Sequence, residues 1–182
     1  MQNRIEGSRN QTDFDAATKL EIFTYLKKAA GFENFIHKRF VGHKRFSLEG
    51  SETLIPALHY LIAKGASMGV QEYFFSMAHR GRLNVLAKII EKPYESIFQE
   101  FSAEQYEEKI ALGDVKYHLG YCNTLTLPGN KTVEVHLVPN PSHLESASPV
   151  IEGIARGIAE NTYQGDFSKI LPVIIHGDAA IA

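Results

Sequence analysis

Four polar segments hold the residue types that can carry chemistry in this chain of 182 residues. They are His79-Arg80-Gly81-Arg82, Tyr117-His118-Leu119-Gly120, Asn140-Pro141-Ser142-His143 and His176-Gly177-Asp178. Arginine offers planar donors that suit phosphate or carboxylate, and histidine donates to anions or relays protons near neutral pH. The carboxylate of Asp178 is a hard oxygen ligand suited to magnesium or a metal-bound phosphate. This inventory fits an anionic cofactor together with an acidic substrate.

Residue types alone do not make this inventory specific. A single histidine is more often a structural residue than a ligand, and basic side chains in a turn are usually solvated. Ser142 and His143 do not form a nucleophile–base pair, because adjacent side chains diverge. The sequence also has no His-x-x-x-His zinc spacing, no phosphate-loop lysine motif and no Gly-x-Gly-x-x-Gly dinucleotide motif.

The elements next to these segments predict how they are positioned. Residues 169–175 form an apolar, β-branched run typical of a buried parallel strand, and it ends in His176, Gly177 and Asp178. A strand over 70–77 likewise leads through a polar turn into a helix. Because open α/β folds bind ligands at the carboxyl edge of the sheet, we expect these turns to lie at that edge.

The remaining pattern alternates helices and strands. We expect helices over residues 13–30, 32–40, 83–90, from Pro93 and over 142–163, and one that starts at Ser51 and is ended by Gly65 and Gly69. A β-hairpin is expected from residues 124–127 and 132–138 around Pro128-Gly129-Asn130. His136 is expected to be a sheet residue rather than a ligand. The basic segment 42–50 is expected to be irregular, with its basic side chains in a solvated turn. The sequence therefore predicts an α/β fold with a partly parallel sheet flanked by helices.

The amino-terminal region combines a polar segment with a long amphipathic helix. Residues 1–12 are polar, and we expect them to be poorly ordered. Asp13 is expected to cap the first long helix and Gly31 to end it. The buried face of that helix is expected to comprise Ala17, Leu20, Phe23 and Leu26.

Composition limits the partners and the compartment. The formal net charge of −2 gives no reason to expect nucleic acid or an anionic membrane as partner. No apolar run approaches the roughly 20 residues of a membrane span, and the first residues lack the apolar core of a signal peptide. The single cysteine, Cys122, excludes an internal disulfide framework and suits a reducing compartment. We expect a cytoplasmic protein.

Five longer motifs contain or extend these segments, and they occur in a fixed order. They are KRFSLEG at residues 44–50, MAHRGRLNVL at 77–86, GDVKYHLG at 113–120, NPSHLE at 140–145 and HGDAA at 176–180. With these motifs the chain, from about Asp13 onward, resembles the thiamine-dependent component of 2-oxoglutarate dehydrogenase. The match covers nearly the whole chain.

This resemblance implies a two-lobed enzyme that uses thiamine diphosphate and Mg²⁺ and acts as an obligate homodimer. Residues 13–182 then correspond to the first part of the diphosphate-binding domain, after a polar segment over 1–12. The implied reaction is the oxidative decarboxylation of 2-oxoglutarate in the citric acid cycle. It passes the succinyl unit to a lipoyl group on a partner dihydrolipoyl succinyltransferase. The implied compartment is the cytoplasm for a bacterial protein and the mitochondrial matrix for a eukaryotic one.

The resemblance also implies roles for individual residues. Arg80 resembles the arginine that contacts the diphosphate, Leu144 an apolar contact to the pyrimidine ring, and Asp178 the first magnesium ligand. His79, His118 and Ser142 resemble the polar wall of the reaction chamber and are the expected catalytic residues. The usual Gly-Asp-Gly of the metal motif reads Gly177-Asp178-Ala179 here, as it does in this family.

Two parts of the implied site are not in these 182 residues. The asparagine of the metal motif and the lobe whose glutamate activates the cofactor lie beyond them, so we expect this segment alone to be inactive. Two alternatives remain open. One is a related component that acts on 2-oxoadipate, since one methylene in a pocket changes selectivity modestly. The other is a non-catalytic binding or scaffold module.

Overall fold

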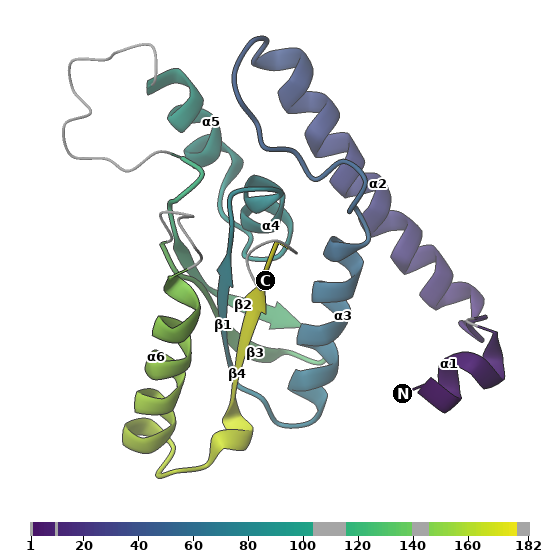
Figure 1. Cartoon of the computed structure of the whole chain (residues 1–182), viewed down its shortest axis with the longest axis vertical. Helices are drawn as coiled ribbons and strands as arrows, with labels where there is room; N and C mark the ends of the chain where they lie inside the picture. The colour runs from purple at the N-terminus through teal and green to yellow at the C-terminus, as the bar shows by residue number, and fades with distance from the viewer. Residues whose placement is uncertain (1, 10, 104–115, 140–145, 178–182) are drawn as a thin grey trace.

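The computed structural model describes residues 2–9, 11–103, 116–139 and 146–177. Over these residues the chain forms six α-helices, one short 3₁₀ helix and four β-strands (Figure 1). In chain order they are α1 (Gln2–Ser8), α2 (Ala16–Arg39), α3 (Leu54–Ser67), β1 (Glu72–Met77), α4 (Arg82–Lys88), α5 (Tyr94–Ala103), β2 (Tyr121–Leu127), β3 (Lys131–Leu137), α6 (Ala147–Thr162), η1 (Phe167–Lys169) and β4 (Ile170–Ile175).

The four strands form one mixed sheet in the order β2-β3-β1-β4. β1 pairs in parallel with both β3 and β4, whereas β2 and β3 form an antiparallel hairpin. This topology confirms the predicted α/β class, the partly parallel sheet and the hairpin. Since β1, β3 and β4 are parallel, their carboxyl ends lie at one edge of the sheet, together with the start of β2.

Side chains of β1 alternate between two apolar layers. Tyr73, Phe75 and Met77 pack into the main core, which also takes side chains from α2, α3, α4 and α5. Phe74 points to the opposite face and packs with Ile151 of α6 in a smaller cluster. Figure 1 shows the same arrangement, with α6 on one side of the sheet and α2 and α3 on the other. The period-two alternation of a strand with both faces covered thus fixes the layers.

The long helix α2 differs from the prediction at both ends. Its N-cap is Asp15, whose carboxylate accepts from the Thr18 amide at 2.7 Å, so the predicted cap at Asp13 is wrong. The helix also continues through Gly31 to Arg39 without a break. A helical glycine costs only about 1 kcal/mol, which the burial of Phe32 in the core outweighs.

The predicted buried face of this helix is also wrong. Leu20 and Phe23 are 65% and 61% exposed, Ala17 is exposed, and Leu26 is half-buried. The buried stripe instead begins at Ala29, because only the carboxyl-terminal half of α2 lies against the main core. Helical spacing of apolar residues therefore identified the helix but not the half of it that packs.

Smaller differences concern the helix ends and the last strand. Within the predicted poorly ordered segment, residues 2–8 form the helix α1. Helix α3 begins at Leu54 instead of Ser51, and it ends at Ser67, between the two glycines that were expected to end it. β4 is parallel, as predicted, but mostly half-buried, because it lies at the end of the strand order and pairs only with β1 among the described residues. Across the described part of the chain, no helix has the length and apolar character that crossing a membrane requires.

The contact between α3 and β1 gives a first testable prediction. A Cβ on Gly65 would lie 2.5 Å from the hydroxyl oxygen of Tyr73, and that buried hydroxyl donates to the Ile62 carbonyl at 2.8 Å. The Gly65→Ala substitution should therefore lower the free energy of unfolding by about 1–3 kcal/mol, measured by urea denaturation.

Gly153→Ala on α6 is the matched control. Nothing lies within 4 Å of its Cβ position, so it should be neutral or stabilise by up to about 1 kcal/mol. Equal effects of the two substitutions would contradict the packing argument.

Candidate active site

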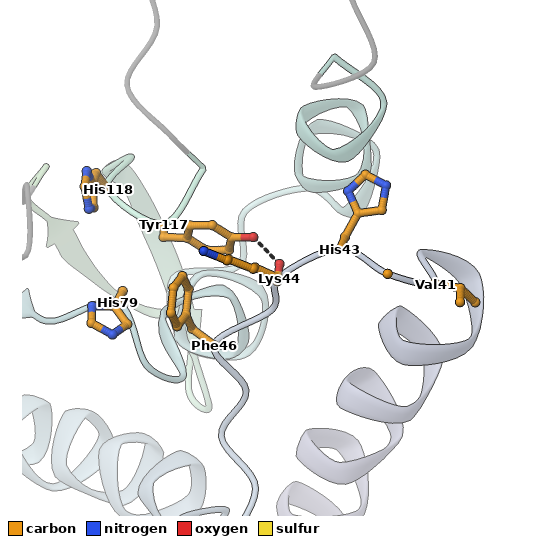
Figure 2. Close-up of a pocket in the computed structure, with 8 residues that line it drawn as sticks. Val41, His43, Lys44, Phe46, His79, Tyr117 and His118 are labelled. Carbon is orange, nitrogen blue, oxygen red and sulfur yellow. Dashed lines mark hydrogen bonds between the residues drawn. The ribbon is translucent and has the colours of Figure 1, made fainter.

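A cavity of about 700 Å³ opens at the carboxyl edge of the sheet (Figure 2). Three segments meet around it: the segment after α2, the turn between β1 and α4, and the turn before β2. The lining residues are Val41, Gly42, His43, Lys44, Phe46, His79, Tyr117 and His118. Two predicted catalytic residues, His79 and His118, are thus brought to one cavity by segments that are distant in the sequence.

The turn that carries His79 packs closely against the segment after α2. Gly81 has φ +75°, and a Cβ there would collide with the side chain of Leu48. The Gly81 amide donates to the Phe46 carbonyl at 2.7 Å. Only glycine fits both the left-handed backbone and this close approach. The pairing therefore fixes His79 relative to the opposite wall of the cavity.

Phe46 separates the two sides of the cavity. Its ring meets the His79 ring edge-on at 4.3 Å and the Tyr117 ring edge-on at 4.7 Å between centroids. Its backbone has φ +45°, a conformation that is strained for a bulky side chain. The Tyr117 hydroxyl in turn donates to the Lys44 carbonyl, which closes the wall (Figure 2). The rings of Phe46 and Tyr117 thus fix the positions of the two histidine-bearing turns relative to each other.

The pKa of His79 lies below its ordinary range. Partial burial is the largest cause, followed by the positive charge of Arg80 and then by His118. The imidazole of His79 is therefore uncharged near neutral pH, with one nitrogen able to donate and the other able to accept. A neutral imidazole of this kind can exchange a proton with a bound substrate.

The segment after α2 is held by a buried carboxylate. Glu33 is 4% exposed, and its Oε1 accepts from the Leu48 amide and from Asn84 Nδ2, each at 3.1 Å. Its Oε2 lies 3.2 Å from Arg45 Nη1. Arg45 also contacts Glu49, so the predicted solvated turn over 42–50 is wrong for this residue. The basic side chain is half-buried because it neutralises a carboxylate that would otherwise be costly to bury.

The other predicted site residues fall into two groups. Arg80 lies in the same turn as His79, and its side chain is exposed. Ser142, Leu144 and Asp178 lie outside the described residues. β4 ends at Ile175, paired with Met77, so His176 leaves the sheet at the same edge as His79. Among the residues that the structure describes, no group of three His, Cys, Asp or Glu side chains could hold a metal ion.

Sequence reasoning missed several residues of the cavity. Lys44, Phe46 and Tyr117 line it, although no role was expected for them. Their membership in the motifs at 44–50 and 113–120 was the available signal. His136 was correctly predicted as a sheet residue: it lies in β3 and stacks on Phe74 at 4.4 Å, outside the cavity lining.

Comparison with known proteins finds relatives that share one name. The chain is 44% identical over 193 aligned positions to the 2-oxoglutarate dehydrogenase E1 component of Brucella anthropi. It is 42% identical over the same length to the proteins of that name from Brucella ovis and Brucella canis. Each alignment covers 100% of this chain and 19% of the relative, so the chain spans about a fifth of the length of these relatives. No protein-family model matches the chain.

The similarity can be stated in two steps. These relatives all carry the name of a dehydrogenase component. More narrowly, the chain is homologous over its whole length to a segment of the 2-oxoglutarate dehydrogenase E1 component. This agrees with the family that the five sequence motifs resemble.

The electrostatics of His79 give a second prediction. Histidine-selective NMR titration should place its midpoint below the ordinary value of about 6.5. Arg80→Gln removes one positive neighbour, so it should raise the midpoint, but not to the ordinary value, because burial remains the larger cause. Arg156→Gln, on the exposed surface of α6, should leave the midpoint unchanged. A midpoint at or above 6.5 in the unsubstituted protein would contradict this assignment.

Proposed function

We propose that this chain is the part of a 2-oxoglutarate dehydrogenase component that builds one wall of its thiamine diphosphate site. The observation that carries the proposal is the meeting of His79 and His118 in one cavity, at the edge of a mixed sheet where its three parallel strands have their carboxyl ends. That edge is where α/β folds bind ligands. The similarity to proteins named 2-oxoglutarate dehydrogenase E1 component supplies the substrate.

The donors at this edge fit an anionic cofactor and an acidic substrate. His79 and His118 line the cavity together with Lys44, and the exposed guanidinium of Arg80 lies next to His79. When bound, thiamine diphosphate supplies the electron sink that allows a 2-oxo acid to lose carbon dioxide. In this proposal Arg80 holds the diphosphate, Leu144 contacts the pyrimidine and Asp178 holds Mg²⁺.

The histidines act on the substrate in this proposal. The uncharged His79 donates one hydrogen bond and accepts another, so it can orient the substrate and hold a proton at one ring nitrogen. His118 faces the same cavity and donates to the substrate from the opposite turn. Ser142 adds a hydroxyl donor. The rings of Phe46 and Tyr117 exclude water from the side of the cavity that they cover.

The proposal also covers the assembly. We infer a diphosphate-binding domain that begins near residue 13 and continues beyond this segment, in a homodimeric enzyme of the bacterial cytoplasm. The acceptor of the succinyl unit is a lipoyl group on dihydrolipoyl succinyltransferase, and the reaction is a step of the citric acid cycle. A segment with the described residues alone holds only part of the ligand set.

Cofactor binding provides the third prediction. Calorimetric titration of the full-length protein with thiamine diphosphate should give saturable, Mg²⁺-dependent binding. Arg80→Gln should weaken the affinity about tenfold or more, because it removes a charged hydrogen-bond donor to the diphosphate. Asp178→Ala should remove the Mg²⁺ dependence. Arg156→Gln removes an equal charge from the exposed surface of α6 and should change nothing. A well-folded full-length protein that does not bind the cofactor would leave the scaffold reading as the better account.

Turnover provides the fourth prediction. His79→Asn and His118→Asn should each lower the rate of 2-oxoglutarate decarboxylation by about a hundredfold, because each removes a group able to transfer a proton at the cavity wall. The rate is measured with an artificial electron acceptor, which bypasses the acyltransferase. His136→Asn, in the sheet outside the cavity lining, is the matched control and should retain activity. Faster turnover of 2-oxoadipate than of 2-oxoglutarate would reassign the substrate while keeping the site.

A further inference from the structure

The largest fully buried side chain among the described residues belongs to Arg82, the first residue of α4. A buried guanidinium is costly unless its donors are satisfied. Here the donors reach four backbone carbonyls. Nη1 donates to Met77 at 2.9 Å, Nε and Nη2 donate to Leu119 at 3.0 and 2.9 Å, and Nη2 also donates to Val138 at 2.6 Å and to His118 at 3.4 Å.

These carbonyls come from three separate segments at the carboxyl edge. Met77 ends β1, Val138 directly follows β3, and His118 and Leu119 form the turn before β2. The β2–β3 hairpin, in which Tyr121 pairs with Leu137, already brings Val138 near the turn before β2, whereas Met77 comes from a strand outside that hairpin. A single planar group therefore ties the ends of two strands to the turn that carries His118.

The backbone around this turn is also tightly packed on its other side. A Cβ on Gly120 would lie 2.7 Å from Cδ of Pro139 and would collide with the Leu137 carbonyl. The turn therefore lies directly against the chain that leaves β3. The turn before β2 can move only away from the chain after β3, and its hydrogen bonds to Arg82 oppose that movement.

We propose that Arg82 is a positioning residue for the two cavity histidines. His79 follows Met77 by two residues, and the His118 carbonyl itself accepts from Arg82. The two turns that carry these imidazoles are thus hydrogen-bonded to the same rigid guanidinium, which sets the distance between the imidazoles across the cavity. The role in turnover rests on the proposed function, whereas the role in placing the imidazoles does not.

The shape of the guanidinium, as well as its charge, carries this role. Arginine presents five N–H donors in a planar fork, which matches carbonyls arriving from several directions. Lysine would keep the positive charge but offers three donors on one nitrogen atom. Arg82→Lys therefore separates the effect of geometry from that of charge. The lysine can donate to fewer of these carbonyls, so the turn before β2 is held less tightly.

The test uses the full-length protein carrying Arg82→Lys, with Arg156→Lys on the surface of α6 as the matched control. We expect a changed His79–His118 separation in a crystal structure. We also expect the His79 titration midpoint to rise, because His118 is one of the causes that lower it. If the proposed function holds, kcat should fall about tenfold or more while thiamine diphosphate still binds. The control should match the unsubstituted protein in every readout.

The outcomes separate the two proposals. If the unsubstituted protein neither binds the cofactor nor turns over, the proposed function fails, and the crystal structure and the His79 titration still decide the role of Arg82. If Arg82→Lys folds with both histidines in place and an unchanged midpoint and kcat, the positioning role is overturned. Should Arg82→Lys not fold, Gly120→Ala displaces the same turn with Arg82 intact. It should then shift the His79 midpoint in the same direction, and an unshifted midpoint would overturn the proposal.

Discussion

The parallel pairing of β1 with both β3 and β4 is the constraint on which the rest of this structure depends. Parallel strands send their carboxyl ends to the same edge, so the turns after three strands must converge there. The antiparallel hairpin adds the start of β2 to that edge. The cavity lies at this edge, where the turn after β1 and the turn before β2 face the segment after α2.

Within that frame, the site is assembled by buried charges rather than by apolar contact alone. Glu33 fixes the segment after α2 by accepting a hydrogen bond from the Leu48 amide and pairing with Arg45, and it also accepts from Asn84 of α4. Arg82 donates to the end of β1 and to the turn before β2. A buried charge tolerates little displacement, because each lost hydrogen bond leaves a desolvated polar group. Glu33 and Arg82 do not line the cavity themselves, but each is hydrogen-bonded to a segment that does, so together they limit how far these segments can move relative to one another.

Much of this architecture could be predicted from the sequence, for reasons that are local. The hairpin was recognisable from alternating residues around Gly129, and the turn after β1 from a β-rich run that ends in His79 and Gly81. The ends of the helices were harder to predict from the sequence. Gly31 resembles a stop, but packing of Phe32 against the core overrides that signal. The carboxylate of Glu33 reads as an ordinary helix-surface charge, since its partners Leu48 and Asn84 are distant in the sequence. Arg80, His79 and His118 were singled out by type, whereas the assignments of Ser142, Leu144 and Asp178 stay predictions.

The left-handed backbone of Phe46 has a consequence for how this segment tolerates change. A bulky residue in that conformation costs about 1–3 kcal/mol, and glycine would relieve most of this strain. Glycine would also remove the ring that stands between His79 and Tyr117. At this one position, conformational stability favours glycine, whereas the shape of the cavity requires the phenylalanine ring. Selection for a more stable protein and selection for a working site would therefore be expected to diverge at Phe46 before they diverge in the surrounding core.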